Sequence, residues 1–473
     1  MVMDFSILTT EILLALLGLA VLILGLVLPG KGRKFVNALA LGGMALVLLY
    51  LILNFSREAG LFNGVYQVDA YGNYFKLLFL MAGLLVILMG ARYIDGFKEK
   101  SNEFYGLMIF ATLGMMLMVA AGEFITLYVG LELMTISFYI LTAYLKSDKL
   151  SGEAGLKYLI LGATSSAILL FGISLLYASM GSTNFIEIGA SFGSSAAVIA
   201  GVLMVIAGFA FKISVVPFHM WTPDIYQGAP IPITTYLSVA SKAAGFAALL
   251  RVFMLAVDPN AVFNWGLLLA VLAAITIVVG NLIALAQRDV KRLLAYSSIA
   301  QAGYILVGAT AANSYGLKGV LFYAMIYVFA NVGAFAVATA VEVDSGRTDI
   351  EAFAGLSKRS PLMAAIMTIC MLSLAGIPPM AGFAGKFYLF AGAIQAGYLW
   401  LALLGLVMSM VSVYYYLGVS KAMYIGENMD EAPLTPGWGS TAALWVCVLA
   451  TLILGVYPGP LSELAGYAIQ IFM

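Results

Sequence analysis

The chain has 473 residues, of which 63% are hydrophobic and only 10% are charged, and its mean hydropathy is +1.04. Ordinary soluble domains carry roughly 25% charged residues, so this composition excludes a soluble protein. The 23 basic and 23 acidic residues cancel and form no basic run, which excludes nucleic acid as a partner. Since one crossing takes about 20 apolar residues, the hydrophobic content suffices for roughly fourteen membrane-spanning helices.

Apolar runs bounded by Gly, Pro, Asn or charged residues predict an all-α membrane protein. Seven crossings are expected over residues 8–28, 35–55, 71–91, 104–121, 124–145, 154–180 and 195–217. Seven more are expected over residues 231–256, 263–286, 293–311, 316–341, 362–394, 399–425 and 440–459. The predicted architecture therefore has about fourteen transmembrane helices.

Lys and Arg collect in the cytoplasmic loops of membrane proteins, so their distribution predicts the orientation of these helices. Three of them, Arg57, Arg251 and Lys318, follow even-numbered helices. Sixteen follow odd-numbered helices: Lys31, Arg33, Lys34, Arg92, Lys98, Lys100, Lys146, Lys149, Lys157, Arg288, Lys291, Arg292, Arg347, Lys358, Arg359 and Lys421. We therefore expect a multi-pass protein of the bacterial inner (plasma) membrane with both termini on the non-cytoplasmic side.

Four lysines fall inside the apolar runs, where a charge costs about 2.5 to 3.5 kcal/mol on insertion scales. Lys212, Lys242 and Lys386 are deep, and Lys242 has nothing nearby that would let it reach the membrane surface. Lys76 lies within two turns of Asp69 at a helix end, so it is interpreted as a snorkelling or locally paired side chain. The three deep lysines are the candidate functional residues.

Two of these lysines end nearly identical strings, AGFAFK at 207–212 and AGFAGK at 381–386, 174 residues apart. Prolines after the first string and before the second predict that helices 7 and 12 are discontinuous. Five helix steps separate the lysines, so the two copies must have opposite orientations. Paired broken helices in inverted repeats indicate an ion or substrate site near the membrane midplane.

The predicted repeats are helices 4–8 and helices 9–13. They divide the chain into four parts: an N-terminal three-helix segment over 1–103, a first repeat over 104–256, a second, inverted repeat over 263–425, and a C-terminal loop and last helix over 426–473.

Glu132 is the single carboxylate predicted at mid-membrane, and the 174-residue shift takes it to Leu306 and takes Lys242 to Tyr416. The charged set is therefore asymmetric between the repeats. A Glu and a Lys could simply form a pair that fixes helix packing. A proton path accounts for all four charges instead, because burial favours a neutral lysine and a nearby carboxylate favours a charged one.

His219 lies in the irregular segment after Lys212 and has two interpretations. It could relay protons, since histidine titrates near neutrality, or it could satisfy carbonyls freed by the helix break. For the Ser, Thr and Tyr side chains near the lysines, we favour a packing role. His219 is the only histidine, and Cys370 and Cys447 lie far apart in the sequence. These residues therefore give no basis for a metal or redox centre in this chain.

Residues 211–230, FKISVVPFHMWTPDIYQGAP, resemble the antiporter-like membrane subunits of bacterial proton-pumping NADH:quinone oxidoreductase (complex I), and subunit N in particular. Further matches are Glu132-Leu133, Lys242, the segments 376–379, 382–383 and 385–386, and the segment 414–417, so the resemblance covers roughly 123–425. Met380 stands where the family pattern has a threonine, and the outer helices agree only in number and hydropathy.

The resemblance implies a proton-translocating subunit with Glu132 paired to Lys212, Lys242 as the central relay, and Lys386 passing protons to the outlet or to a neighbouring subunit. It also implies that NADH and quinone bind elsewhere, that partner subunits carry flavin and iron–sulfur clusters, and that the chain contacts other membrane-arm subunits within the lipid bilayer. Two alternatives stay open: a Mrp-type cation/proton antiporter or a related hydrogenase-type subunit, and an inert packing subunit.

Overall fold

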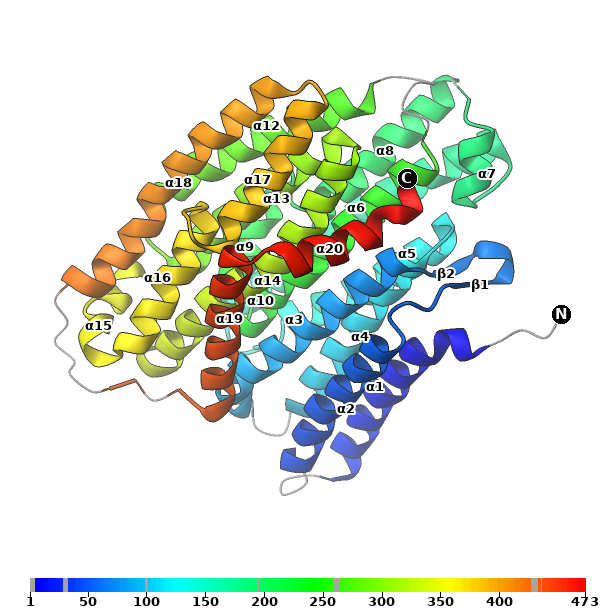
Figure 1. Cartoon of the computed structure of the whole chain (residues 1–473). Coiled ribbons are helices and arrows are strands. Elements are labelled where there is room, and N and C mark those ends of the chain that lie inside the picture. The colour runs from blue at the N-terminus through cyan, green and yellow to red at the C-terminus, as the bar shows by residue number, and fades with distance from the viewer. Residues whose placement is uncertain are drawn as a thin grey trace.

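The structure is a computed structural model that describes residues 5–28, 33–97, 101–193, 195–257, 264–426, 433–434 and 436–473. Lys31, Lys98 and Lys100, which contribute to the predicted orientation, lie outside these residues. Helices dominate the described chain, as the sequence predicts (Figure 1).

Within the described ranges, twelve helices are long and apolar enough to cross a membrane. One crossing consists of α10 (Ile231–Tyr236), a π-helical turn η5 (Leu237–Ser241) and α11 (Lys242–Leu255). The others are α1 (Thr9–Val27), α2 (Arg33–Leu53), α3 (Ala70–Asp95), α4 (Ser101–Ala120), α5 (Phe124–Thr142), α6 (Lys149–Met180), α12 (Trp265–Ala284), α13 (Val290–Ala311), α14 (Ser314–Ser345), α18 (Leu399–Ile425) and α19 (Trp438–Val456).

Two further crossings are interrupted. The seventh is divided into α8 (Ala196–Lys212) and α9 (Trp221–Gly228), and the twelfth into α16 (Pro361–Ala375) and α17 (Ala381–Gln395). The prediction that helices 7 and 12 are discontinuous is confirmed. The interruptions occur where proline removes a backbone donor and clashes with the preceding turn.

The remaining elements are short. They are η1 (Phe5–Leu8), β1 (Ala59–Leu61), η3 (Phe62–Gly64), β2 (Tyr66–Val68), α7 (Phe185–Ala190), η6 (Ile350–Phe353), α15 (Leu356–Arg359), α20 (Gly459–Ala468) and η7 (Ile469–Phe472). Strands β1 and β2 pair antiparallel as a hairpin.

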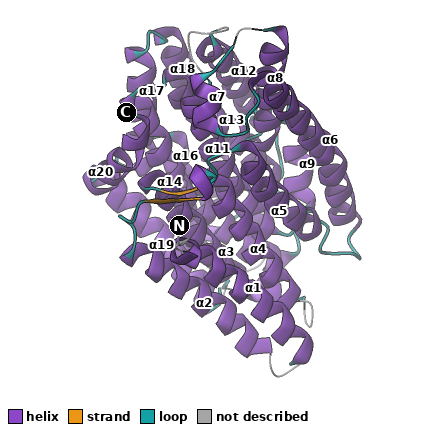
Figure 2. Ribbon diagram, turned by 90° about the vertical axis from the view of Figure 1, so that its right-hand side faces the viewer, coloured by secondary structure: helices purple, strands orange, loops and turns teal. Residues whose placement is uncertain are grey.

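The crossings form an elongated bundle with α1 and α2 at one end and α18 at the other (Figures 1 and 2). Helix α14 is enclosed along its length by neighbouring helices, and it packs against α13, α16, α17 and α19. The C-terminal helix α20 crosses α14 and α3. The first break is buried over residues 213–216 but exposed at Pro217 and Met220, and the second is exposed at Pro378 and Pro379.

Helices α4 and α5 touch through their backbones. A Cβ atom on Gly114 would lie 2.4 Å from the Met134 amide nitrogen, and one on Gly130 would lie 2.6 Å from the Met118 amide nitrogen. A larger residue at either position would collide with the backbone of the facing helix, so only glycine fits. Small residues of this kind allow helix backbones to approach closely in membranes.

Two buried ion pairs differ from the sequence interpretation. Lys76 does not pair with Asp69; its ammonium lies 2.7 Å from the carboxylate of Glu11 on α1, with both side chains buried. Asp69 instead contacts Arg251 at 2.8 Å. Arg251 therefore lies inside α11, fully buried, rather than in a connecting loop. Charge pairing between helices explains why these residues are stable in an apolar bundle.

Candidate functional site

The first break follows directly after Lys212. Side chains satisfy backbone groups that it frees: the Trp221 indole N–H donates to the Phe211 carbonyl at 2.9 Å, and the Val216 N–H donates to the Thr276 hydroxyl at 3.0 Å. Buried backbone groups need such partners. The break therefore holds Lys212 at a defined position at the end of α8.

Lys212 and Glu132 lie in one region, but they do not form an ion pair in this structure. The Lys212 ammonium donates to Thr135 at 2.8 Å and to Tyr158 at 3.4 Å. Glu132 accepts from the hydroxyl of Ser166 on α6. Thr135 lies about one turn after Glu132 on α5, so the Lys212 ammonium contacts the helix that carries the carboxylate.

His219 lies between the two parts of the broken helix and is half-buried. Its Nδ1 atom is buried and has no hydrogen-bond partner among the described residues. The ring nevertheless interacts with the backbone of Pro217 at the break, as expected of a histidine that satisfies a freed carbonyl. An unpartnered buried nitrogen is a typical location for an ordered water.

Lys242 is 3% exposed and begins α11 directly after the π-helical turn. Its ammonium donates to the Ser298 hydroxyl at 2.8 Å and to the Ser298 carbonyl at 3.0 Å, and it faces the Tyr226 ring at 5.7 Å. Among described residues it has no carboxylate within ion-pair distance. The central lysine is thus held by dipoles and an aromatic face alone.

A run of polar contacts leads from this lysine toward Lys386. Ser297, the neighbour of Ser298, shares a 2.5 Å hydrogen bond with Tyr416. The Gln301 amide donates to Tyr416 at 3.2 Å and to the Leu374 carbonyl at 2.8 Å. Lys386 donates to the same carbonyl at 3.2 Å. Two sets of buried polar contacts, one at Lys242 and Ser298 and one from Ser297 to Lys386, therefore begin at adjacent residues of α13 and extend into the second half of the bundle.

Lys386 lies beyond the second break, in α17. Its ammonium also donates to the Ala375 carbonyl and the Ser409 hydroxyl, each at 3.0 Å, and faces the Tyr304 ring at 4.3 Å. A cavity of about 420 Å³ opens from it between α17 and α18, lined mainly by apolar side chains such as Phe387 and Met410. Lys386 is therefore buried but borders an open apolar cavity.

The sequence analysis did not single out Ser298 or Gln301, and it placed the neighbouring hydroxyls in packing roles. A signal was present, because Gln301 is an amide inside the apolar run 293–311. Such a residue needs partners within the bundle. Its partners, Tyr416, Tyr323 and Leu374, come from three other helices and could not be identified from spacing.

Gln301→Leu tests whether these contacts matter. The variant keeps a side chain of similar size but removes the contacts to Tyr416 and Leu374. If the chain moves protons, as the resemblance implies, pumping should fall by about tenfold, less than the 10²-fold or more typical of losing a general acid or base. Pumping is measured as proton uptake by membrane vesicles during NADH oxidation. Gln395→Leu, on the exposed end of α17, is the matched control and should match the wild type.

Residues 121–412 match the family described as "NADH:quinone oxidoreductase/Mrp antiporter, TM". The NADH-quinone oxidoreductase subunit N of Desulforamulus reducens is 50% identical over 99% of this chain and 99% of its own length. The chain belongs to the NADH-quinone oxidoreductase subunit N family.

Solved structures agree with this family. A chain of respiratory complex I from Thermus thermophilus with bound aureothin is 36% identical, with a TM-score of 0.81, over 97% of this chain and 99% of that one. A chain of the Mrp complex from Dietzia is 20% identical, with a TM-score of 0.89, over 99% and 98%, and it shares the fold. In the described part of this subunit N chain, no cluster of three His, Cys, Asp or Glu residues could hold a metal.

Proposed function

We propose that this chain is a proton-translocating membrane-arm subunit of a complex I enzyme, in which quinone reduction in partner subunits drives the protons. The observation that carries the proposal is the placement of the two sets of buried polar contacts between Lys242 and the cavity beside Lys386. A lysine without a counter-charge at the centre of the bundle lowers the stability of the protein. Such a residue is therefore not expected in a subunit whose only role is packing.

In this proposal, the protons move on water that the polar groups orient. The amide of Gln301 and the carbonyl of Leu374 do not exchange protons readily, but both hydrogen-bond water. A proton leaves the Lys242 ammonium, passes through water near Tyr416, and is taken up by the neutral amine of Lys386. Each amine alternates between three and two protons, so charge is conserved at every transfer.

The Glu132–Lys212 pair would control the moment at which Lys242 releases its proton. For unit charges about 6 Å apart at an effective dielectric of about 20, the Coulomb energy is roughly 3 kcal/mol. The Thr135 hydroxyl can bond to the Lys212 ammonium while the ion pair is open, as in this structure. Closing the pair would then remove positive potential from the region of Lys242. His219 would hold water beside this pair.

Lys386 would pass its proton to the outlet or to an adjacent subunit. The apolar cavity beside it fits a helix of a neighbouring antiporter-like subunit that presents an acidic side chain to the ammonium. The subunit would contact other membrane-arm subunits and lipid, with flavin and iron–sulfur clusters bound by partner chains.

The proposal also includes the two inverted units, 104–256 and 263–425, between the segments 1–103 and 426–473. Lys and Arg favour a cytoplasmic position for the connections after odd-numbered helices, so both termini would lie on the non-cytoplasmic side of the inner membrane.

A Mrp-type cation/proton antiporter is the second candidate, because the family and the Dietzia structure share this fold. Inverted vesicles that contain the whole complex distinguish the two. Proton uptake that depends on NADH and quinone supports the first function. Proton release on addition of Na⁺, in the absence of NADH, supports the antiporter.

Glu132→Gln is expected to reduce coupled turnover more than Glu132→Asp. The amide removes the charge that acts on Lys212 while it retains packing and the contact with Ser166, whereas aspartate keeps the charge at a shorter reach. NADH oxidation and proton uptake are measured together, with exposed Glu463→Gln as the control. Wild-type rates for glutamine with impaired rates for aspartate would show a steric role and contradict the charge switch.

A further inference from the structure

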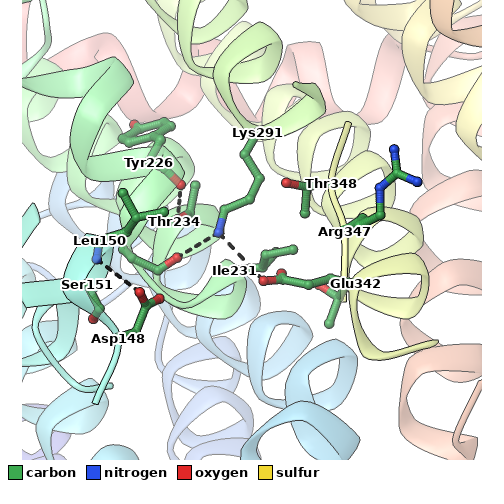
Figure 3. A network of polar contacts seen from close by, with 12 residues as sticks. Asp148, Leu150, Ser151, Tyr226, Ile231, Thr234, Lys291, Glu342, Arg347 and Thr348 are labelled. Carbon is green, nitrogen blue, oxygen red and sulfur yellow. Dashed lines mark hydrogen bonds and ion pairs between the residues drawn. The ribbon is translucent and has the colours of Figure 1, made fainter. Parts of the chain in front are cut away.

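The cytoplasmic-side end of α13 carries a buried charge that the proposed proton route does not use. Lys291 is 5% exposed, lies 3.9 Å from the carboxylate of Glu342 on α14, and donates to the Ala229 carbonyl at 3.0 Å (Figure 3). The carboxylate of Glu342 is partly exposed, but its Oε2 atom is buried and has no hydrogen-bond partner among the described residues. Glu342 therefore borders both the surface and the interior.

Helix α13 leads from this pair directly to the central lysine. Ser298, which holds Lys242, lies seven residues after Lys291, so both project from one face of α13, about 10 Å apart along its axis. Helix α9 packs against α13. The Glu342–Lys291 pair is thus aligned with the Lys242 site.

Two buried tyrosine hydroxyls lie beside the Ser298 hydroxyl near Lys242. Tyr226 on α9 and Tyr327 on α14 both face the Ser298 hydroxyl, but neither hydroxyl makes a hydrogen bond of normal geometry to any described residue. Buried hydroxyls of this kind are usually bonded to ordered water. With three neighbouring hydroxyls and the Lys242 ammonium, the site offers the two to four polar partners that a water needs.

We propose that Glu342 is the proton-loading carboxylate for Lys242. It takes a proton from bulk water, the proton moves along water held by Tyr226 and Tyr327, and the neutral amine of Lys242 accepts it, which returns Glu342 to the carboxylate. Lys291 is a positioning residue that holds the Glu342 side chain at the mouth of this route. The inference rests on the proposed proton-translocating function.

The transfer requires a chain of several waters. Roughly 10 Å separate Lys291 from Ser298 along α13, but Glu342 and Tyr327 lie fifteen residues, or about 22 Å, apart along α14, so several waters at a hydrogen-bond spacing of about 3 Å are needed between them. The titratable groups that face Glu342 are Lys291, Asp289, Asp148 and Tyr93. Of these, Asp289 and Asp148 are N-caps of α13 and α6, so their carboxylates are already engaged with backbone N–H groups.

The experiment uses the whole complex in inverted membrane vesicles, in which the cytoplasmic face contacts the buffer. We expect Glu342→Gln to slow NADH-driven proton uptake by about tenfold at alkaline pH, because bulk protons must then load Lys242 directly. The rate should recover as the buffer is acidified. In Glu342→Ala, which unlike glutamine leaves space at the carboxylate position, formate should restore part of the rate by carrying protons there. Tyr226→Phe should slow uptake without rescue by formate.

Glu351→Gln is the matched control, since Glu351 is an exposed carboxylate at the same end of the bundle, paired only with Arg347. Wild-type uptake by both Glu342→Gln and Tyr226→Phe would overturn the inference. A loss by Glu342→Gln that acid does not relieve, with a loss by Glu342→Ala that formate does not relieve, would also overturn it, because the carboxylate would then be structural. If Lys242→Ala itself pumps normally, the proposed function fails; if only Lys242→Ala is impaired, this loading route alone fails.

Discussion

Replacing Lys242 with alanine is expected to leave the complex assembled while it abolishes most coupled proton pumping, a loss of about 10²-fold or more. Among the described residues, Lys242 is the only amine that donates to Ser298, and the neighbouring Tyr226 and Tyr327 hydroxyls cannot replace an amine as the group that holds the proton between the two halves. Assembly should survive because the substitution removes a buried charge that lacks a counter-ion. Proton uptake and NADH oxidation are measured in the same vesicles.

The Lys242→Met variant removes the charge of the lysine while it keeps most of the side-chain volume. Alanine leaves a cavity that can cost about 2 to 5 kcal/mol, whereas methionine fills most of it. Both variants should fail to pump if the charge matters. Lys421→Ala, at the exposed end of α18, controls for the general loss of a lysine. An unchanged ratio of protons to electrons at an unchanged turnover in Lys242→Met would remove Lys242 from the route.

The second large effect is expected at Lys386. Lys386→Met should reduce pumping by about tenfold or more, and Lys386→Arg should retain more activity, because arginine keeps the positive charge although it releases a proton poorly. The arginine can also still donate to the carbonyls of Leu374 and Ala375. Stopped-flow measurement of vesicle acidification gives the initial rates.

Lys358→Met, an exposed lysine on α15, is the control for this pair. The placement of Lys386 at a subunit contact has its own test. A structure of the assembled complex should show a partner acidic side chain or water in the cavity between α17 and α18. A dry cavity filled by apolar side chains, together with wild-type pumping by Lys386→Met, would contradict the assigned role.

The local features of the site were predictable because they depend on residues close together in the sequence. Proline removes a backbone donor, so the breaks after Lys212 and before Lys386 follow from composition alone. The depth of Lys242 follows from the length of its apolar run. The resemblance in residues 211–230 identified the family of the chain, and the comparisons confirm that family.

What the sequence did not predict depends on contacts between distant helices. Lys76 pairs with Glu11 rather than the nearby Asp69, because α3 packs near α1 and brings the two side chains together. Periodicity does not specify which helices become neighbours. For the same reason, Ser298 could not be recognised as the ligand of Lys242, 56 residues away.

The close contact of α4 and α5 divides the molecule into parts that can move and parts that cannot. Because Gly114 and Gly130 admit no additional atom, the two helices cannot slide past each other without a collision of backbone atoms. In the proposed charge switch, α5 would therefore hold the backbone of Glu132 in place. The long side chain of Lys212, at the end of α8, would then be the part that moves.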